Sequence, residues 1–378
     1  MKENNKLNVC VIFGGKSTEH DISIISGIQV YNALDKSKYN AFVIYIDKEN
    51  KAYMGKNLHL LKTYKKENIY KQTKKVSLIN EFDQVFIKQK RKKIKIDCFI
   101  PVVHGEGVED GTLSAILDFV GATYITSNIT SSSIAQDKIF TKDILRKYHI
   151  ITPRYLWVKQ GDSSNNICEN IKTKLKFPLI IKPARLGSSI GIEVVNNEVE
   201  LIEKINKAFM YSNRLIVEEK IENFKEYNCA AFIFKNKIYT SCIEEVLSSN
   251  PYLTFEDKYI SGKTKQEEQN RIIPASIPKA LEEKIKNLTK IIYQVLDFKG
   301  VIRIDFMYDV KKELLYFNEV NTIPGSLAYY LFDKCDISFD KMLDMLIKES
   351  ILRRTKDQKL IKVFKSNLLN TKSLKLNK

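Results

Sequence analysis

The sequence contains few histidines and no closely paired cysteines. Its 378 residues include four histidines and six cysteines, and no two cysteines have the C-x-x-C spacing typical of zinc or redox sites. Several of the cysteines lie inside apolar runs. We therefore predict reduced cysteines, with neither a structural zinc site nor a disulfide framework. The six are Cys10, Cys98, Cys168, Cys229, Cys242 and Cys335.

Long apolar runs and the common nucleotide fingerprints are also missing. No apolar run approaches the ~18–20 residues that a membrane-spanning helix needs. The start, MKENNKLNVCVIFGG, has a basic lead but only a short apolar run without a cleavage site, so we predict a cytoplasmic protein. Gly15-Lys16-Ser17 does not complete a P-loop, because the required earlier glycine is replaced by Cys10. No dinucleotide-binding fingerprint occurs.

Arginine is scarce although the chain is strongly basic. Only nine of the 62 basic residues are Arg, so the formal net charge of +17 comes mainly from Lys spread along the whole chain. The densest clusters, 62–75 and 88–93, fall where we expect exposed loops or strand ends. This spread is more typical of solvent-exposed lysines than of a nucleic-acid-binding surface. A small polyanionic substrate would match the positive net charge equally well. We expect no nucleic-acid partner.

What is present is typical of a globular protein with several lobes. Hydrophobic residues make up 44% and charged residues 28% of the chain. Apolar runs at 7–13, 41–46 and 96–103 alternate with helical stretches, which predicts a parallel α/β lobe over residues 1–126. Thr18 and Asp21 have the spacing of a capping box, so we predict that the first helix begins there.

The rest of the chain is predicted to form two more lobes of mixed α+β structure. Residues 127–214 contain a helix through Lys138, two strands joined by a Gly/Ser loop, another helix and a strand. Residues 215–350 alternate strands with a long amphipathic helix. Residues 351–378 form a Lys- and Asn-rich basic tail with little periodic pattern.

Two neighbouring strands carry the strongest group of chemical side chains. VIRIDFMYD contains Arg303 and Asp305, and LLYFNEVN contains Glu319 and Asn321. Members of each pair are two residues apart, so they share one face of their strand. If the strands pair in register, two carboxylates and an amide meet as hard oxygen ligands suited to Mg²⁺. The alternative is a surface ladder of salt bridges.

A second group lies in IIKPARLGSSIG. Lys182 ends an apolar strand, and a flexible loop with Gly187, Ser188, Ser189 and Gly191 follows. Backbone N–H groups of such a loop can close over phosphates while the Lys supplies a positive charge. A Gly/Ser hairpin with a chance Lys would look the same. Lys138 is a second candidate phosphate ligand, although alone it resembles any surface Lys.

These pieces occur in the order and spacing of the D-alanine–D-alanine ligase family, which the chain resembles from residue 7 to about 345. The matching blocks are FGGKSTEHDISIISG, HGEGVEDGTL, FPLIIKPARLGSSIG, and RIDFMYD with NEVNTIPG. The resemblance implies a three-lobed ATP-grasp architecture with an N-terminal parallel α/β lobe. It also implies ATP-dependent joining of two D-alanines through a D-alanyl phosphate for peptidoglycan precursors, two Mg²⁺ or Mn²⁺ ions, and a homodimer formed through the first lobe.

The resemblance also implies roles for single residues around the first substrate. Glu19 would hold its ammonium group, and Ser188 with Tyr259 would hold a closing lid shut. Arg303 and the backbone N–H of Gly325 would stabilise the oxyanion of the tetrahedral intermediate. His104 matches a substrate-lobe histidine of secondary role, and a plain loop histidine is an equal alternative.

The remaining implied roles concern the nucleotide and the metal. The metal ligands would be Asp305, Glu319 and Asn321. The ATP-binding positions would be Lys138, Lys182, Ser189, Glu219, Lys220, Glu226 and Lys258. Among these, Glu219 and Glu226 match residues that contact adenine and ribose, and Lys258 would approach the terminal phosphate or the second substrate's carboxylate.

The sequence departs from the family pattern near the second substrate. Five residues beyond Gly325 the family usually has a Ser that binds the acceptor carboxylate, and here Tyr330 occupies that position. ENFKEYN lacks the usual Gly before its Glu, and TYITS replaces a Gly-containing turn. D-alanine is the expected acceptor, while D-Ser, D-lactate and other amino acids are alternatives. A catalytically silent nucleotide- or nucleic-acid-binding protein is the rival from another class.

Overall fold

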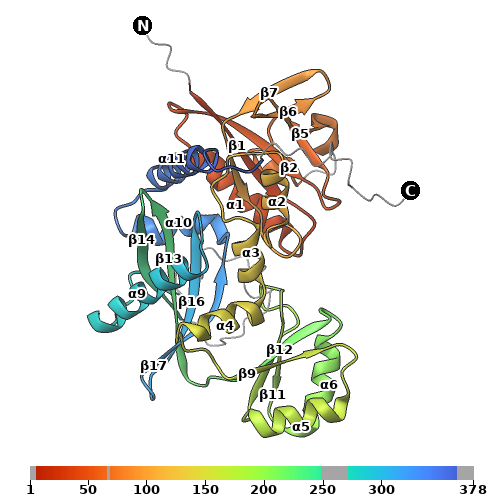
Figure 1. The fold of residues 1–378 in the computed structure, drawn as a ribbon, viewed down its shortest axis with the longest axis vertical. Helices are drawn as coiled ribbons and strands as arrows, with labels where there is room; N and C mark the ends of the chain where they lie inside the picture. Colours follow the sequence, from red (N-terminus) through yellow and green to blue (C-terminus); the bar gives the residue numbers. More distant parts are fainter. Residues whose placement is uncertain (1–5, 66–68, 248–270, 364–378) are drawn as a thin grey trace, which may run out of the picture.

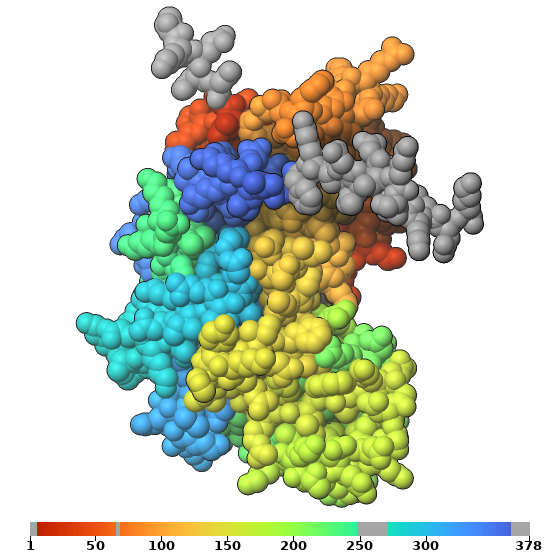
Figure 2. All heavy atoms as spheres, viewed as in Figure 1, coloured from red at the N-terminus to blue at the C-terminus, as the bar shows by residue number. Residues whose placement is uncertain are grey.

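The computed structural model describes residues 6–65, 69–247 and 271–363, which form three lobes (Figure 1). The N-terminal lobe lies at the top of the view with α11 against it, and the central lobe, with α5 and α6, lies at the bottom. The third lobe carries β13, β14, β16 and β17. Between the lower two lobes, the side chains of α3 and α4 fill the junction (Figure 2).

The N-terminal lobe is built on a buried parallel sheet, as the alternating sequence pattern predicts. β1 is its central strand and pairs in parallel with β2 and β8. Its residues from Val9 to Phe13 are fully buried because both faces are covered. A separate antiparallel meander of β5, β6 and β7 lies beside it. The bounds are β1 Leu7–Gly14, α1 His20–Ala33, β2 Tyr39–Ile46, β3 Ala52–Gly55, β4 Thr73–Lys75, β5 Ser77–Glu81, β6 Gln84–Gln89, β7 Lys92–Ile96, β8 Cys98–Val102 and α2 Thr112–Phe119.

The first helix begins later than its capping-box spacing predicts. α1 starts at His20, and Glu19 occupies its N-cap position without a side-chain capping bond. The chain leaves β1 through Gly14 and Gly15, both with positive φ, and His20 Nδ1 then donates to the Gly15 carbonyl at 2.6 Å. A Cβ on Gly14 would lie 2.1 Å from the Ile46 carbonyl oxygen, so this turn requires glycine. Thr18 therefore stays in the loop.

The central lobe is an antiparallel sheet with helices on both faces. Its strand order is β11-β10-β12-β9, with α5 and α6 covering an apolar core on one face. On the other face α4 places Ile139 against Tyr155 and Ile216. The bounds are α3 Ile129–Gln136, α4 Lys138–Lys147, β9 Tyr155–Lys159, α5 Ser164–Lys174, β10 Leu179–Pro183, β11 Glu193–Val195, α6 Glu198–Ala208 and β12 Arg214–Glu219.

The third lobe is a sheet of order β15-β14-β13-β16-β17 whose two faces differ. One face packs on α9 through residues such as Ile304 and Phe306. The other face contributes Ala230 and Phe232 to the core of the N-terminal lobe, together with α10 and α11. The bounds are β13 Phe224–Phe234, β14 Lys237–Val246, β15 Arg271–Ile272, α9 Lys279–Val295, β16 Ile302–Asp309, β17 Leu314–Asn321, a 3-10 turn η3 Gly325–Ala328, α10 Tyr329–Asp333 and α11 Phe339–Asp357.

Two expectations from the sequence differ from the structure here. α11 continues to Asp357, beyond residue 350 where the tail was expected to begin, because Ile351 packs against the N-terminal lobe core and Arg353 donates to the Tyr124 carbonyl at 2.6 Å. Cys242 and Cys335 form a disulfide, which corrects the prediction that all six cysteines are reduced. Their separation of 93 residues gave no local sequence signal for the pairing. Within the described ranges, no helix is long and apolar enough to cross a membrane.

Candidate active site

The four polar side chains of β16 and β17 come together as their strand spacing predicts. Asp305 lies directly opposite Glu319, and Arg303 lies opposite Asn321. Arg303 makes a two-pronged ion pair with Asp305, from Nε at 2.7 Å and from the terminal nitrogen at 2.8 Å. Asn321 Nδ2 donates to the same carboxylate at 3.1 Å. The prediction of one polar patch on this face is therefore confirmed.

The patch continues across two more strands that the sequence reasoning missed. Asn228 on β13 pairs with Asp305 on one side and with Glu244 of β14 on the other. Both Asn228 and Glu244 are buried, and the Asn228 amide donates to Glu244 at 3.0 Å. Burial raises the pKa of the Asp305 carboxyl, Glu319 and Glu244 add to this rise, and Arg303 opposes it. The only sequence signal was a polar residue interrupting each buried strand.

Both predicted phosphate lysines face this patch from the central lobe. Lys182, at the end of β10, contacts Asn318 Oδ1 of β17 at 3.1 Å. Lys138, the first residue of α4, donates to the Leu186 carbonyl at 2.6 Å and lies 3.6 Å from Glu319 Oε2. The two lysines therefore place the Gly/Ser loop next to the carboxylates of β16 and β17. Their positive charges can neutralise a phosphate bound there.

A buried ion-pair network behind Lys182 was not predicted. Glu218 of β12 contacts Lys142 of α4, and its other oxygen lies 2.8 Å from Lys182 Nζ. Burial works against the charge of Glu218, but Lys142 and Lys182 outweigh burial and lower the pKa of this carboxyl to about 2. Burial lowers the pKa of Lys142 to about 8 against the opposing effect of Glu218. The network holds the Lys182 ammonium group in place.

The predicted nucleotide contact Glu219 points away from this network. Successive residues of a strand face opposite sides, and Glu219 accepts from the Lys176 backbone at 3.0 Å and lies 3.7 Å from Arg154. Its neighbour Glu218 is the acidic residue on the Lys182 face. Glu226 of β13 shares its face with Asn228, as the predicted role requires. Lys220 follows β12 and donates its backbone N–H to the Pro178 carbonyl.

The Gly/Ser loop meets the start of α1. Ser188 donates its hydroxyl hydrogen bond to the Glu19 carboxylate, which joins the central lobe to the N-terminal lobe. Ser188 and Ser189 both have left-handed backbone conformations, with φ of 53° and 60°. A Cβ at Gly187 would lie 3.4 Å from Glu19 Oε1, so the loop backbone approaches this carboxylate closely. Lys258 and Tyr259 lie outside the described residues, and their predicted roles stay predictions.

His104 and Glu109 occupy the loop after β8. His104 is buried with Nε2 3.1 Å from Ser26 Oγ, and burial lowers the pKa of its imidazole to about 4. Glu109 accepts hydrogen bonds from the backbone N–H groups of Gly105 and Ile323, both at 3.0 Å. It therefore joins this loop to the segment that leads to Gly325. Burial, followed by the charge of Glu19, raises the pKa of Glu109 to about 7.

Glu109 should make the folding stability depend on pH. Its pKa is raised from 4.5 in the unfolded chain to about 7, so its stabilising contribution is complete below about pH 4.5 and is lost as the pH rises to about 7. The difference corresponds to about 3 kcal/mol. Urea unfolding at about pH 5 and about pH 8 should show this loss in the parent protein and not in Glu109→Gln. The exposed neighbour Glu106, changed to Gln, is the control, and equal pH slopes in all three proteins would contradict the assignment.

Tyr330 lies beside the polar patch. It belongs to α10, and its hydroxyl donates to Glu244 Oε2 at 3.2 Å. Arg271 pairs with the other Glu244 oxygen at 3.1 Å and lies over the Tyr330 ring, with its guanidinium carbon 5.3 Å from the ring centre. Burial raises the pKa of Tyr330 to about 12, so the hydroxyl stays a hydrogen-bond donor at neutral pH. Gly325, at the start of η3, is exposed and has open space where a Cβ would point.

The donors of this patch fit a divalent cation that also holds phosphate. Two carboxylates face each other on adjacent strands, an amide lies beside them, and two lysines flank them. Mg²⁺ prefers oxygen ligands and commonly uses one or two carboxylates together with substrate phosphates. Among the described residues there is no group of three His, Cys, Asp or Glu side chains that could hold a metal ion.

The fold and the site together define an ATP-grasp carboxylate–amine ligase. The family model "D-ala D-ala ligase N-terminus" matches residues 8–127, and "D-ala D-ala ligase C-terminus" matches residues 144–348. The D-alanine–D-alanine ligase of Thermosipho melanesiensis is 36% identical over 369 residues, covering 97% of this chain and 99% of that protein. The ligase of Campylobacter jejuni subsp. doylei is 34% identical, covering 92% and 95%. The chain belongs to the D-alanine–D-alanine ligase family.

Solved structures agree with this assignment. The D-alanine–D-alanine ligase of Coxiella burnetii superposes with a TM-score of 0.82 at 25% identity, covering 94% of this chain and 97% of that chain. The VanG D-Ala:D-Ser ligase of Enterococcus faecalis gives 0.79 at 28% identity, covering 92% and 100%. The Helicobacter pylori enzyme gives 0.72 at 31% identity, covering 91% and 98%. The three-lobed fold predicted from the sequence is confirmed.

Proposed function

We propose that this protein joins two D-alanines with ATP, through a D-alanyl phosphate, to supply the dipeptide for peptidoglycan. The observation that carries the proposal is the facing pair Asp305 and Glu319 beside Lys138 and Lys182. A carboxylate is a poor acyl donor, so the first D-alanine takes the γ-phosphoryl group of ATP before its carbonyl is attacked. This transfer gathers negative charge, which these lysines neutralise.

Magnesium, or manganese in its place, fits the same patch. We propose that two ions bind at Asp305, Glu319 and Asn321, and they would neutralise and orient the nucleotide's phosphate oxygens. The ATP-binding residues are Lys138, Lys182, Ser189, Glu219, Lys220, Glu226 and Lys258, with Glu219 and Glu226 near adenine and ribose. The buried Glu218 would act indirectly, by holding the Lys182 ammonium group.

The first lobe and the Gly/Ser loop would hold the first substrate. Glu19 binds the ammonium group of that D-alanine, and Ser188 with Tyr259 closes the site. Arg303 and the Gly325 backbone N–H stabilise the oxyanion that forms when the second amine attacks the acyl phosphate. Closure matters because water would hydrolyse this intermediate. The hydrogen bond between Ser188 and Glu19 supports the joint role of the two lobes, and His104 would support this loop.

A different acceptor is a second candidate because of Tyr330. Its ring is larger than the Ser side chain that the family usually has at this position. Its hydroxyl donates to Glu244, so the hydrogen-bond donor for the second substrate's carboxylate differs from that Ser. The likeness to a solved D-Ala:D-Ser ligase also concerns an enzyme whose acceptor is not D-alanine. D-Ser, D-lactate and other amino acids are therefore alternatives for the second substrate.

A substrate panel tests the proposal. Purified protein is supplied with ATP, Mg²⁺ and D-alanine alone or with D-Ser, D-lactate or L-alanine, and ADP and product masses are measured. We expect ADP formation with D-alanine alone and a product of the mass of D-alanyl-D-alanine. A mixed product dominating over D-alanyl-D-alanine would favour the second candidate. No ADP with any amino acid, together with steeply salt-dependent DNA or RNA binding, would contradict ligase function.

The same proposal includes a homodimer in the cytoplasm, where ATP is available. Ile116 and Phe119 on α2 are 51% and 93% exposed, and two large apolar side chains on one helix of the first lobe suit a contact with a second copy. Sedimentation analysis should show a dimer that Phe119→Glu weakens. A parent protein that stays monomeric at high concentration would contradict this part.

A further inference from the structure

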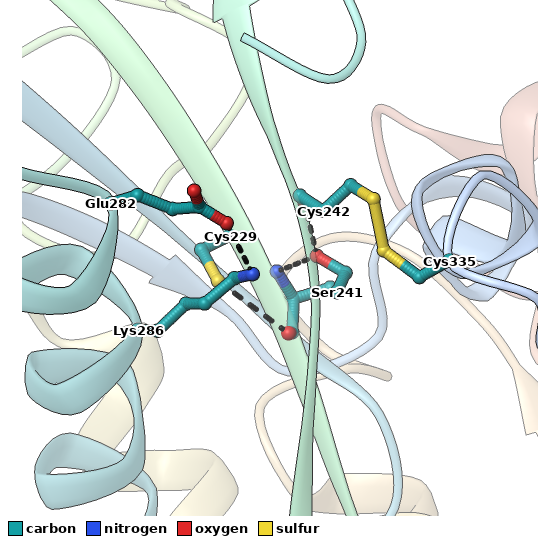
Figure 3. Close-up of a disulfide and its surroundings, with 7 residues drawn as sticks. Cys229, Ser241, Cys242, Glu282, Lys286 and Cys335 are labelled. Atoms are coloured by element: carbon teal, nitrogen blue, oxygen red, sulfur yellow. Dashed lines mark hydrogen bonds and ion pairs between the residues drawn. A yellow bond between two sulfur atoms is a disulfide. The ribbon is translucent and has the colours of Figure 1, made fainter. Parts of the chain in front are cut away.

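The disulfide lies on the active-site side of the third lobe. Cys242 belongs to β14, and Cys335 follows α10, with their Cα atoms 5.9 Å apart. Figure 3 shows Cys242 reaching toward the segment that carries Cys335, while Cys229, Glu282 and Lys286 lie on the other side of the strand. Both disulfide residues are half-buried, so a small reagent can reach the bond.

The disulfide repeats a link that the active site already makes. Cys242 and Glu244 are two apart on β14 and face the same side. Glu244 accepts the Tyr330 hydroxyl of α10, and the disulfide joins the residue that follows α10 to the same strand. α10 is therefore tied to β14 by one hydrogen bond near its start and by one covalent bond just after its end.

The segment before α10 needs such support. Ser326, Leu327 and Ala328 have φ of 49°, 56° and 49°, a left-handed conformation that non-glycine residues adopt only when their surroundings impose it. Leu327 and Ala328 are buried in the core shared with the N-terminal lobe, and Ser326 N donates to Ser26 Oγ at 3.0 Å. Loosening α10 would therefore also loosen the turn that begins at Gly325.

We propose that Cys242 and Cys335 are a reversible thiol–disulfide modification site whose oxidised form fixes α10 and so tightens binding of the second substrate. In a reducing compartment, disulfides are usually transient and redox-sensing rather than structural. The kinetic half of this inference rests on the proposed ligase function, whereas the thiol chemistry does not.

The step needs a low-molecular-weight disulfide as oxidant. One cysteine thiolate attacks a sulfur of that disulfide, whose S–S bond breaks and releases one small thiolate. The second cysteine thiolate then attacks the protein sulfur of the mixed disulfide, forms the Cys242–Cys335 bond and releases the second small thiolate. Two electrons pass from the cysteines to the reagent, and the two thiol protons pass to the released thiolates. A small dithiol reverses the sequence.

The other cysteines are poorly placed for this reaction. Cys10, Cys98 and Cys229 are fully buried, and burial raises the pKa of each thiol, that of Cys98 to about 12. Cys168 is half-buried on α5 in the central lobe and has no disulfide. It is the matched control thiol for Cys335.

Thiol mapping tests the modification. The full-length protein is equilibrated with oxidised or reduced glutathione, alkylated, digested and analysed by mass spectrometry. We expect the peptides of Cys242 and Cys335 to be joined after oxidation and both alkylated after reduction, with Cys168 outside any intramolecular bond. Alkylation of both cysteines in the oxidised sample would overturn the proposal.

Hydrogen exchange and kinetics test the consequence. Amide exchange of residues 325–333 should be faster in the reduced protein than in the oxidised protein. In Cys335→Ser it should be equally fast under oxidising and reducing conditions. Reduction should raise the KM for the second D-alanine about threefold to tenfold and leave the KM for ATP within about twofold, as for couplings of this kind. Cys168→Ser should retain both redox responses.

Two outcomes separate this proposal from the proposed function. If neither redox state ligates but amide exchange at residues 325–333 still depends on redox state, the proposed ligase function is contradicted and the disulfide's effect on α10 stands. If ligation is normal but exchange and KM values are equal in both redox states, the disulfide's effect on α10 is contradicted and the ligase function stands.

Discussion

Asp305→Asn is expected to lower kcat for ADP formation by about 10³-fold or more. The substitution keeps the side-chain size but removes the charge that faces Glu319 and receives the Arg303 ion pair. An Asn in its place binds a divalent cation weakly and leaves Arg303 without its ion-pair partner. The negative charge that develops during phosphoryl transfer is then less well stabilised. Coupled ADP assays over a range of Mg²⁺ concentrations measure the effect.

The matched control for this prediction is Asp297→Asn. Asp297 lies on the turn after α9 and its side chain is 70% exposed. Circular dichroism should show that both variants fold, and only Asp305→Asn should lose activity. A value of kcat within about tenfold of the parent protein, with unchanged Mg²⁺ dependence, would mean that this patch is not the metal site.

Glu218→Gln is expected to destabilise the protein by about 3–5 kcal/mol, as in other buried ion pairs that lose one partner. The Glu218 and Lys142 side chains are each 1% exposed, so removing this carboxylate leaves Lys142 and the nearly buried Lys182 ammonium group without its main counter-charge. The KM for ATP should also rise, because Lys182 loses the contact that positions it. Urea unfolding and ATP titration of initial rates measure the two effects.

A double-mutant cycle separates the charge effect from a general loss of packing. Lys142→Met added to Glu218→Gln removes one of the two buried cations and should recover part of the lost free energy of unfolding. Glu219→Gln is the control for stability. Its carboxylate pairs with the exposed Arg154 side chain, so we expect a cost below about 1 kcal/mol. A larger cost for Glu219→Gln than for Glu218→Gln would contradict the buried network.

The predictions that succeeded depended on local periodicity. The two-residue spacing of Arg303 and Asp305, and of Glu319 and Asn321, sufficed to place each pair on one face of a strand. The alternation of apolar runs and helices likewise predicted the parallel sheet around β1. α1 begins at His20 with Glu19 at its N-cap, one position after the Thr18 cap that the spacing predicted.

The missed features depend on contacts between distant parts of the chain. Glu218 and Glu219 are adjacent residues of the same type. Only the packing of α4 on one side of β12 makes Glu218 the buried member of the network and leaves Glu219 on the opposite side. Cys242 and Cys335 lie in unrelated segments, and the pairing appears only when α10 packs on β14. Glu109 likewise acquires its raised pKa from burial against the segment of Ile323.

The sequence by itself therefore determined the family, the order of the lobes and the shared face of the polar residues on β16 and β17, because these features follow from short-range spacing and from motifs within single strands and loops. The tertiary structure decided which of two adjacent glutamates supports Lys182, which cysteines meet, and what Tyr330 contacts. Those outcomes depend on burial and on the side of a strand that faces another lobe, and neither is encoded within a short stretch of residues.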